Sequence, residues 1–196
     1  MRFRDMFDEA VRRVRGEHGR YFLLDRMPDE AVCAEIGVWR GEFSRQILKY
    51  TNPETLYLID PWEYQPEFPD RQYGGAVADE QMEMDGMYRT VHRRFGGRND
   101  VEILRKYSRE ALAIFEDDAL DWVYIDGNHF YEYVKRDLEM SLEKVRPGGF
   151  VTGDDYEWGD EHDYPVKRAV NEIVAEEDVV VETVWNDQYV LRNGGG

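Results

Sequence analysis

The sequence predicts a doubly wound α/β fold with a mostly parallel sheet, and three features carry that prediction. The first is a strand–helix–strand unit over residues 120–156, where two apolar runs flank a segment with apolar residues at three-to-four spacing. Such a unit crosses over right-handed and pairs its strands in parallel. The second is an apolar run that enters a turn at Gly37, followed by another that ends in Asp60. The third is a pair of apolar runs around Asn186-Asp187, a connection typical of a β-hairpin.

Strands and helices alternate along the chain until this closing hairpin, which requires an antiparallel strand beside the parallel ones. Seven strands are expected, over residues 31–36, 56–60, 101–104, 122–125, 150–152, 179–185 and 188–191. Helices are expected over residues 2–15, 42–50, 78–95, 109–116 and 130–145, and from Pro165 onward. Pro147-Gly148-Gly149 has turn chemistry and should separate the fifth helix from the strand that follows.

Two segments flank or interrupt this pattern. Residues 1–27 read as an N-terminal helical segment, because apolar residues between 2 and 15 share one helix face. Its predicted position is on the sheet or over the sheet's mouth. Residues 61–98 begin with a loop rich in Pro, Gly and aromatic residues and continue into a helix. Because long connections are often functional, we interpret 61–98 as a substrate lid, with an ordinary extra helix as the alternative.

Length and composition limit the classes of protein to which this chain can belong. The 196 residues are expected to form a single domain, 1–196, with a sizeable core. The formal charge of −17 argues against a nucleic-acid partner and suits a metal or cationic ligand, although a salt-adapted proteome has the same bias. No apolar run is long enough to span a membrane, and the first residues do not read as a secretory signal. The single cysteine, Cys33, excludes an internal disulfide, so a cytoplasmic setting is expected, with a homo-oligomer left open.

The glycine turn indicates which nucleoside the fold would bind. A glycine turn followed by an acidic strand end is how doubly wound folds place backbone near a ligand and a carboxylate, here Asp60, on ribose hydroxyls. A dinucleotide site needs G-x-G-x-x-G, but this turn runs from Gly37 to Gly41 as G-x-x-x-G, with Trp39 at the second glycine position. S-adenosylmethionine (SAM) lacks a pyrophosphate and tolerates such a side chain. Glu35, two residues before the turn, supports this interpretation.

With these residues read, the chain resembles the Rossmann-like class I SAM-dependent methyltransferases over about residues 30–192. The run E-I-G-V-W-R-G matches their first motif, and the closing hairpin matches their last two strands. More narrowly, the chain is similar to the metal-dependent O-methyltransferases of the catechol and macrocin types, within methyltransferase family 24. Asp126, Asp154 and Asp155 fall on that group's metal-ligand positions. His129, three residues after Asp126, matches a histidine of the macrocin-type enzymes.

The resemblance implies a SAM-dependent O-methyltransferase that acts on a hydroxyl of a small molecule such as a sugar or polyphenol. The expected cofactors are SAM and Mg²⁺, since carboxylate oxygens suit Mg²⁺. A metal would lower the pKa of the acceptor hydroxyl, and His129 would take its proton, with Asp126 as the second catalytic residue. Ser108, after the third strand, is expected to contact adenine, and Asp126 is counted with the SAM contacts as well.

Two other functions stay open at this point. The first is a metal-independent small-molecule methyltransferase in which the aspartates are structural. The second is a SAM-binding or scaffold protein without catalysis, because cephalosporin-hydroxylase-like proteins share the same core and a fold does not by itself prove an activity.

Overall fold

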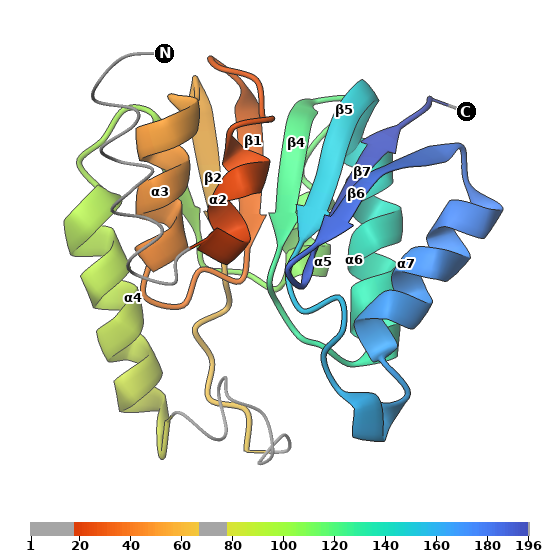
Figure 1. Cartoon of the computed structure of the whole chain (residues 1–196). Coiled ribbons are helices and arrows are strands. Elements are labelled where there is room, and N and C mark those ends of the chain that lie inside the picture. The colour runs from red at the N-terminus through yellow and green to blue at the C-terminus, as the bar shows by residue number, and fades with distance from the viewer. Residues whose placement is uncertain (1–17, 67–77, 196) are drawn as a thin grey trace.

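The computed structural model describes residues 18–66 and 78–195. Its middle layer is a seven-stranded sheet with the order β3-β2-β1-β4-β5-β7-β6 (Figure 1). The strands are β1 Val32–Ile36, β2 Thr55–Ile59, β3 Val101–Leu104, β4 Leu120–Ile125, β5 Val145–Gly153, β6 Val179–Trp185 and β7 Gln188–Asn193. The pairs among β1 to β5 are parallel, whereas β7 runs antiparallel to both of its neighbours. The predicted mostly parallel sheet with a closing antiparallel hairpin is confirmed.

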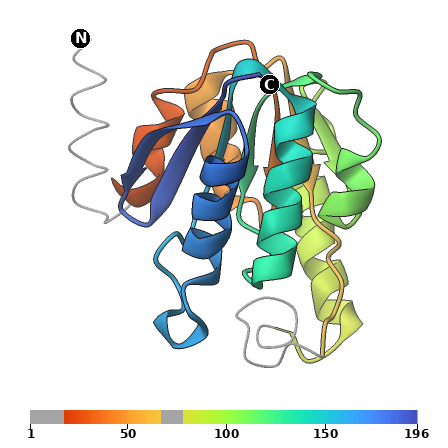
Figure 2. The ribbon, with the colours of Figure 1, turned by 90° about the vertical axis from the view of Figure 1, so that its right-hand side faces the viewer.

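Helices cover both faces of the sheet (Figures 1 and 2). They are α2 His18–Leu24, α3 Glu42–Thr51, α4 Gln81–Phe95, α5 Ser108–Leu112, α6 Tyr131–Lys144 and α7 Pro165–Glu176, with a 3₁₀ turn, η1, at Asp160–His162. Strand β4 shows how the sheet divides the core, because its side chains alternate between the two faces. Trp122 and Tyr124 pack with α2, α3 and α4, while Val123 and Ile125 pack with α5, α6 and α7. All four side chains are buried.

The register of the parallel strands places their carboxyl ends level with one another. Ile36 of β1 pairs with both Ile59 and Ile125, and Ile125 pairs with Gly153. The residues that come next in the chain, including Asp126, therefore lie along one edge of the sheet. Ligands of open α/β sheets bind outside this edge.

The hairpin follows the predicted turn chemistry. Asn186 and Asp187 both adopt left-handed backbone conformations, with φ of 49° and 64°. Two positive φ values in a two-residue loop match the right-handed twist of the flanking strands. In the described part of the chain, no helix is both long and apolar enough to cross a membrane.

The structure differs from the sequence expectations in two segments. The predicted helix over 109–116 is α5, which ends at Leu112 because tight turns replace the helical pattern beyond it. The predicted Pro147-Gly148-Gly149 turn lies within β5, whose pairing with β4 is interrupted there by an irregularity. The expected helix over residues 2–15 lies outside the described residues.

The second half of the predicted lid is a core helix. Met84, Met87, Val91 and Phe95 of α4 are buried against the sheet. Arg105 ties the preceding segment to this helix: its guanidinium donates to the carbonyl of Trp62 at 3.1 Å and forms an ion pair with Asp85. Residues 67–77 lie outside the described residues, and the lid function stays a prediction.

Candidate cofactor and metal site

The turn after β1 brings the backbone of two strand ends into contact. Gly37 has a φ of +86°, and a Cβ placed on it would lie 1.9 Å from the carbonyl oxygen of Asp126. The amide of Gly37 donates to Ile59 at 2.9 Å, and the amide of Asp126 donates to Ile36 at 2.8 Å. Only glycine fits such a close approach at a positive φ. The turn and the end of β4 thus form one rigid floor at the sheet edge.

Asp60 holds this turn in place. One oxygen of its buried carboxylate accepts hydrogen bonds from the amides of Val38 and Trp39, both at 2.9 Å. Its other oxygen accepts a hydrogen bond from the amide of Trp62 at 2.7 Å. The predicted contact of Asp60 with ribose hydroxyls stays a prediction. In the structure Asp60 also stabilises the glycine turn, a role that the sequence did not indicate.

Trp39 adopts a conformation that normally belongs to glycine. Its φ is +52°, although a bulky residue rarely occupies the left-handed region. The carbonyl of Trp39 accepts a hydrogen bond from the indole of Trp62 at 2.8 Å. The Arg40 guanidinium lies 4.8 Å from the centre of the Trp39 ring. Backbone strain of this kind persists where the surroundings enforce it, often at functional sites.

Glu35 points its carboxyl group into the same region from β1. The side chain is 1% exposed, and its Oε2 has no hydrogen-bond partner among the described residues. Burial raises the pKa of Glu35 well above its usual range; Ser44 opposes this shift, and the charge of Asp126 adds to it. A buried polar atom without a partner is a costly arrangement that a bound ligand would relieve. This observation fits the predicted SAM site.

Three side chains at the ends of β4 and β5 form a group that could hold a metal ion. The group consists of Asp126, His129 and Asp155, whose ligand atoms all lie within 4.8 Å of one another. His129 Nε2 lies 2.9 Å from Asp155 Oδ2 and 3.8 Å from Asp126 Oδ1. Both contacts are ion pairs when the imidazole is protonated. Two carboxylates and one imidazole are a donor set for a divalent cation.

Asp154 lies beside this group but points elsewhere. Its carboxylate accepts hydrogen bonds from the side chain of Gln188 and from the amide of Asp155, and forms an ion pair with Arg20. Both aspartates follow the end of β5, and Asp155 adopts a left-handed backbone conformation with a φ of +59°. The geometry therefore gathers His129 with Asp126 and Asp155, and the expected ligation by Asp154 stays a prediction.

Arg20 is a site residue that the sequence reasoning missed. It lies on α2, and its guanidinium donates to Asp126 Oδ2 at 2.8 Å while it also pairs with Asp154. Burial opposes the charge on Arg20, but the nearby Tyr124, Asp126 and Asp154 outweigh that effect and raise its pKa. Nothing in the local sequence marks this arginine among the many others of the chain.

The same charges set the protonation of the metal group. Burial of the imidazole favours its neutral form, but Asp126 and Asp155 outweigh burial and raise the pKa of His129 to about 9. Burial also acts on Asp155, yet His129 lowers the pKa of that carboxyl. Burial, with the repulsion of Asp126, raises the pKa of Asp154 to about 6. Without a metal, His129 is therefore a cation at neutral pH.

The remaining two predicted cofactor residues have structural partners. Ser108 begins α5, and its hydroxyl donates to Asp137 Oδ1 at 2.6 Å. Gly41 caps α3 with a φ of +75°, and a Cβ there would meet the ring of Phe95 at 2.6 Å. Their contacts with SAM stay predictions.

Comparison with known proteins decides the family. The family described as a methyltransferase domain, methyltransferase family 24, matches residues 34–156, which include the glycine turn and the metal group. The chain belongs to this family. It is a class I SAM-dependent methyltransferase, as its motifs predict.

Two relatives found by sequence have no stated activity. An uncharacterized protein of Acanthamoeba polyphaga mimivirus, R132, is 27% identical over 172 residues, covering 81% of this chain and 68% of its own length. An uncharacterized protein of Sinorhizobium fredii, y4gI, is 42% identical over 55 residues. That match spans 28% of this chain and only 6% of the y4gI protein.

Solved structures share the fold of this methyltransferase. A Corynebacterium glutamicum protein superposes with a TM-score of 0.61 at 16% identity, covering 89% of this chain and 80% of its own. The O-methyltransferase NovP superposes with a TM-score of 0.58 at 22% identity, covering 87% of this chain and 74% of its own.

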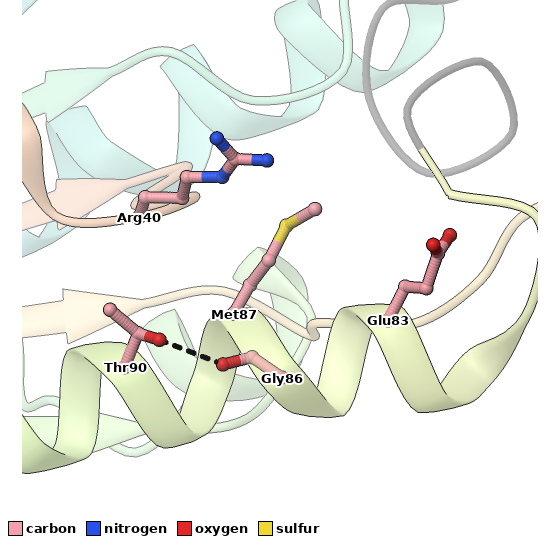
Figure 3. A pocket seen from close by; sticks show the side chains of 5 residues that line it. All are labelled: Arg40, Glu83, Gly86, Met87 and Thr90. Carbon is pink, nitrogen blue, oxygen red and sulfur yellow. Dashed lines mark hydrogen bonds between the residues drawn. The ribbon is translucent and has the colours of Figure 1, made fainter.

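A pocket of about 270 Å³ opens beside the glycine turn of the methyltransferase. Arg40 reaches toward it from the β1–α3 turn, and α4 supplies Glu83, Met87 and Thr90 (Figure 3). The Thr90 hydroxyl donates to the carbonyl of Gly86 at 2.9 Å. None of the predicted cofactor or metal residues lines this pocket.

Asp137 gives the methyltransferase a stability that depends on pH. Burial raises the pKa of this carboxyl to about 6, although Ser108 and Arg136 oppose the shift. The folded state then binds more protons than the unfolded state between about pH 4 and 6, so stability falls as pH rises through that range. Above it, the buried charge costs about 3 kcal/mol. The stability of Asp137→Asn relative to the wild type should therefore increase, by up to about 3 kcal/mol, as the pH is raised from 4.5 to 8.

Urea unfolding at the two pH values measures this change. Glu139→Gln is the matched control, because Glu139 lies on the same helix with an exposed side chain. Its free energy of unfolding relative to the wild type should stay constant with pH. An Asp137→Asn difference that is equally constant would contradict the assignment.

Proposed function

We propose that this methyltransferase transfers a methyl group from SAM to a hydroxyl of a small molecule, such as a sugar or polyphenol, with the help of Mg²⁺. The observation that carries the proposal is the gathering of Asp126, His129 and Asp155 directly beside the Gly37 turn. A cofactor turn and a cation-binding group at one sheet edge are the two parts that this reaction needs.

Asp126 and Asp155 would hold the metal through carboxylate oxygens, which Mg²⁺ prefers. When bound, the ion would lower the pKa of the acceptor hydroxyl and fix its position. Mn²⁺ accepts the same carboxylate ligands, so both ions belong in the test.

The chain's own residues would place the methyl donor. Glu35, two residues before Gly37, offers a buried carboxyl oxygen that has no hydrogen-bond partner among the described residues. Asp60 keeps the turn in shape by accepting hydrogen bonds from the amides of Val38 and Trp39. Rigid placement of donor and acceptor supplies much of the rate in a methyl transfer, because the reacting atoms must be aligned.

His129 would take the proton of the acceptor hydroxyl. The imidazole lies next to the two carboxylates that would hold the metal, within reach of a hydroxyl bound there. In the metal-free state those carboxylates keep it protonated, so it must lose that proton before it can act as a base. Occupation of Asp126 and Asp155 by a divalent cation would remove this stabilisation of the imidazolium.

A metal-independent methyltransferase is the second candidate, and one observation favours it. Arg20 already supplies a permanent positive charge to Asp126 and Asp154, and the His129 imidazolium supplies another. These two cations could neutralise the carboxylates at this sheet edge without a metal ion.

Turnover in the presence and absence of metal separates the two candidates. The purified chain would be incubated with SAM and a panel of catechols, polyphenols and sugars, and release of S-adenosylhomocysteine would be followed. We expect EDTA to abolish release and Mg²⁺ or Mn²⁺ to restore it. Full activity in EDTA would reject the metal mechanism in favour of the metal-independent one. The expected homo-oligomer and the cytoplasmic location stay predictions.

A further inference from the structure

We propose that Arg20 binds the carboxylate of the methionyl group of SAM, so that helix α2 is part of the cofactor site. The inference rests on the proposed SAM binding at this sheet edge and adds a residue to it. Three observations support it: the charge of the edge, the position of Arg20 and the donors that its guanidinium keeps available.

The edge is acidic, whereas SAM carries charges of both signs. Carboxyl groups of Glu35, Asp60, Asp126, Asp154 and Asp155 all lie near the strand ends. They suit the sulfonium and the ammonium group of SAM. Its carboxylate, in contrast, would be repelled unless a cation lies beside it. A site that binds the whole cofactor therefore needs one fixed positive charge.

Within residues 18–66 and 78–195, two cationic side chains contact these carboxylates, Arg20 and His129. His129 lies between Asp126 and Asp155, in the group assigned to the metal. Arg20 lies on the other face of the sheet, where α2 and α3 pack, and its guanidinium is 5.7 Å from the ring centre of Phe43. Its charge also acts on Glu35 and Tyr124, which belong to that face.

The guanidinium has room for a further acceptor. It carries five N–H donors, and Asp126 and Asp154 engage one terminal nitrogen each. The Arg20 side chain remains 40% exposed. Two carboxylates that pair with an arginine fix its orientation, and its remaining N–H groups can then bind a third carboxylate.

Binding of SAM and of decarboxylated SAM tests the assignment, because the second ligand keeps the sulfonium and the ammonium group and lacks only the carboxylate. Isothermal titration would compare the wild type with Arg20→Gln, Arg20→Lys and Arg26→Gln. Arg26 is the matched control: it follows α2, is exposed and lies over the ring of Phe22.

We expect the wild type and Arg26→Gln to bind SAM about 10- to 100-fold more tightly than decarboxylated SAM, as one charge-assisted contact provides. Arg20→Gln should bind the two ligands with affinities within a few-fold of each other. Arg20→Lys should keep part of the preference, because lysine keeps the positive charge.

Two outcomes would overturn the proposal while SAM binding itself stands. A preference for SAM that persists in Arg20→Gln would reduce Arg20 to an anchor of α2 on the sheet. Equal affinities in the wild type would show that the carboxylate is not recognised at all. A wild type that binds neither ligand would instead reject the proposed cofactor site as a whole.

Discussion

Asp126→Asn is expected to reduce methyl transfer about 10³-fold or more, because the metal group would lose a charged ligand worth several kcal/mol to the transition state. Asp126 is the member of the group that faces both His129 and Arg20. The change should also weaken Mn²⁺ binding, measured by titration, while the affinity for SAM changes by a few-fold at most.

Asp121→Asn is the matched control for this variant. Asp121 lies on β4 like the residues before Asp126, but near the amino end of the strand, where it accepts a hydrogen bond from the amide of Val32 at 2.7 Å. Asparagine keeps that acceptor, so turnover should stay near the wild-type rate. A large loss of SAM affinity in Asp126→Asn would assign Asp126 primarily to the cofactor. Unchanged, EDTA-sensitive turnover would remove it from the metal group.

The sequence predicted the sheet edge well because strand ends are visible in the pattern of apolar runs. Asp60 and Asp126 each follow a buried strand, so parallel register alone places them on one edge. The pattern could not decide between Asp154 and Asp155. Neighbouring residues at a strand end point in different directions, and which one faces His129 depends on the left-handed backbone of Asp155.

Arg20 illustrates a contact that sequence reasoning does not reach. It is 106 positions from Asp126 in the sequence. It lies on the short helix α2, which packs on the opposite face of the sheet from α6. An arginine on an amphipathic helix is normally a solvated residue, and this chain has many of them. Only the three-dimensional arrangement, which brings α2 over the ends of β4 and β5, turns it into a partner of two aspartates.

Gly37 is the position where the smallest change should have the largest structural effect. Its φ of +86° is unfavourable for any residue with a Cβ. A methyl group there would also lie 1.9 Å from the carbonyl oxygen and 2.4 Å from the carbonyl carbon of Asp126, which are backbone atoms of a buried strand end. Neither can move without breaking the pairing of β1 with β4.

Gly37→Ala should therefore destabilise the fold by about 3–5 kcal/mol, the range of the most damaging single substitutions, and should abolish SAM binding in whatever protein still folds. Urea unfolding and titration with SAM measure the two effects. Gly97→Ala is the matched control, because no atom lies within 4 Å of a Cβ at that exposed turn, and its stability should stay within about 0.5 kcal/mol of the wild type. If Gly37→Ala bound SAM with wild-type affinity, the close contact between the turn and Asp126 would not be the floor of the cofactor site.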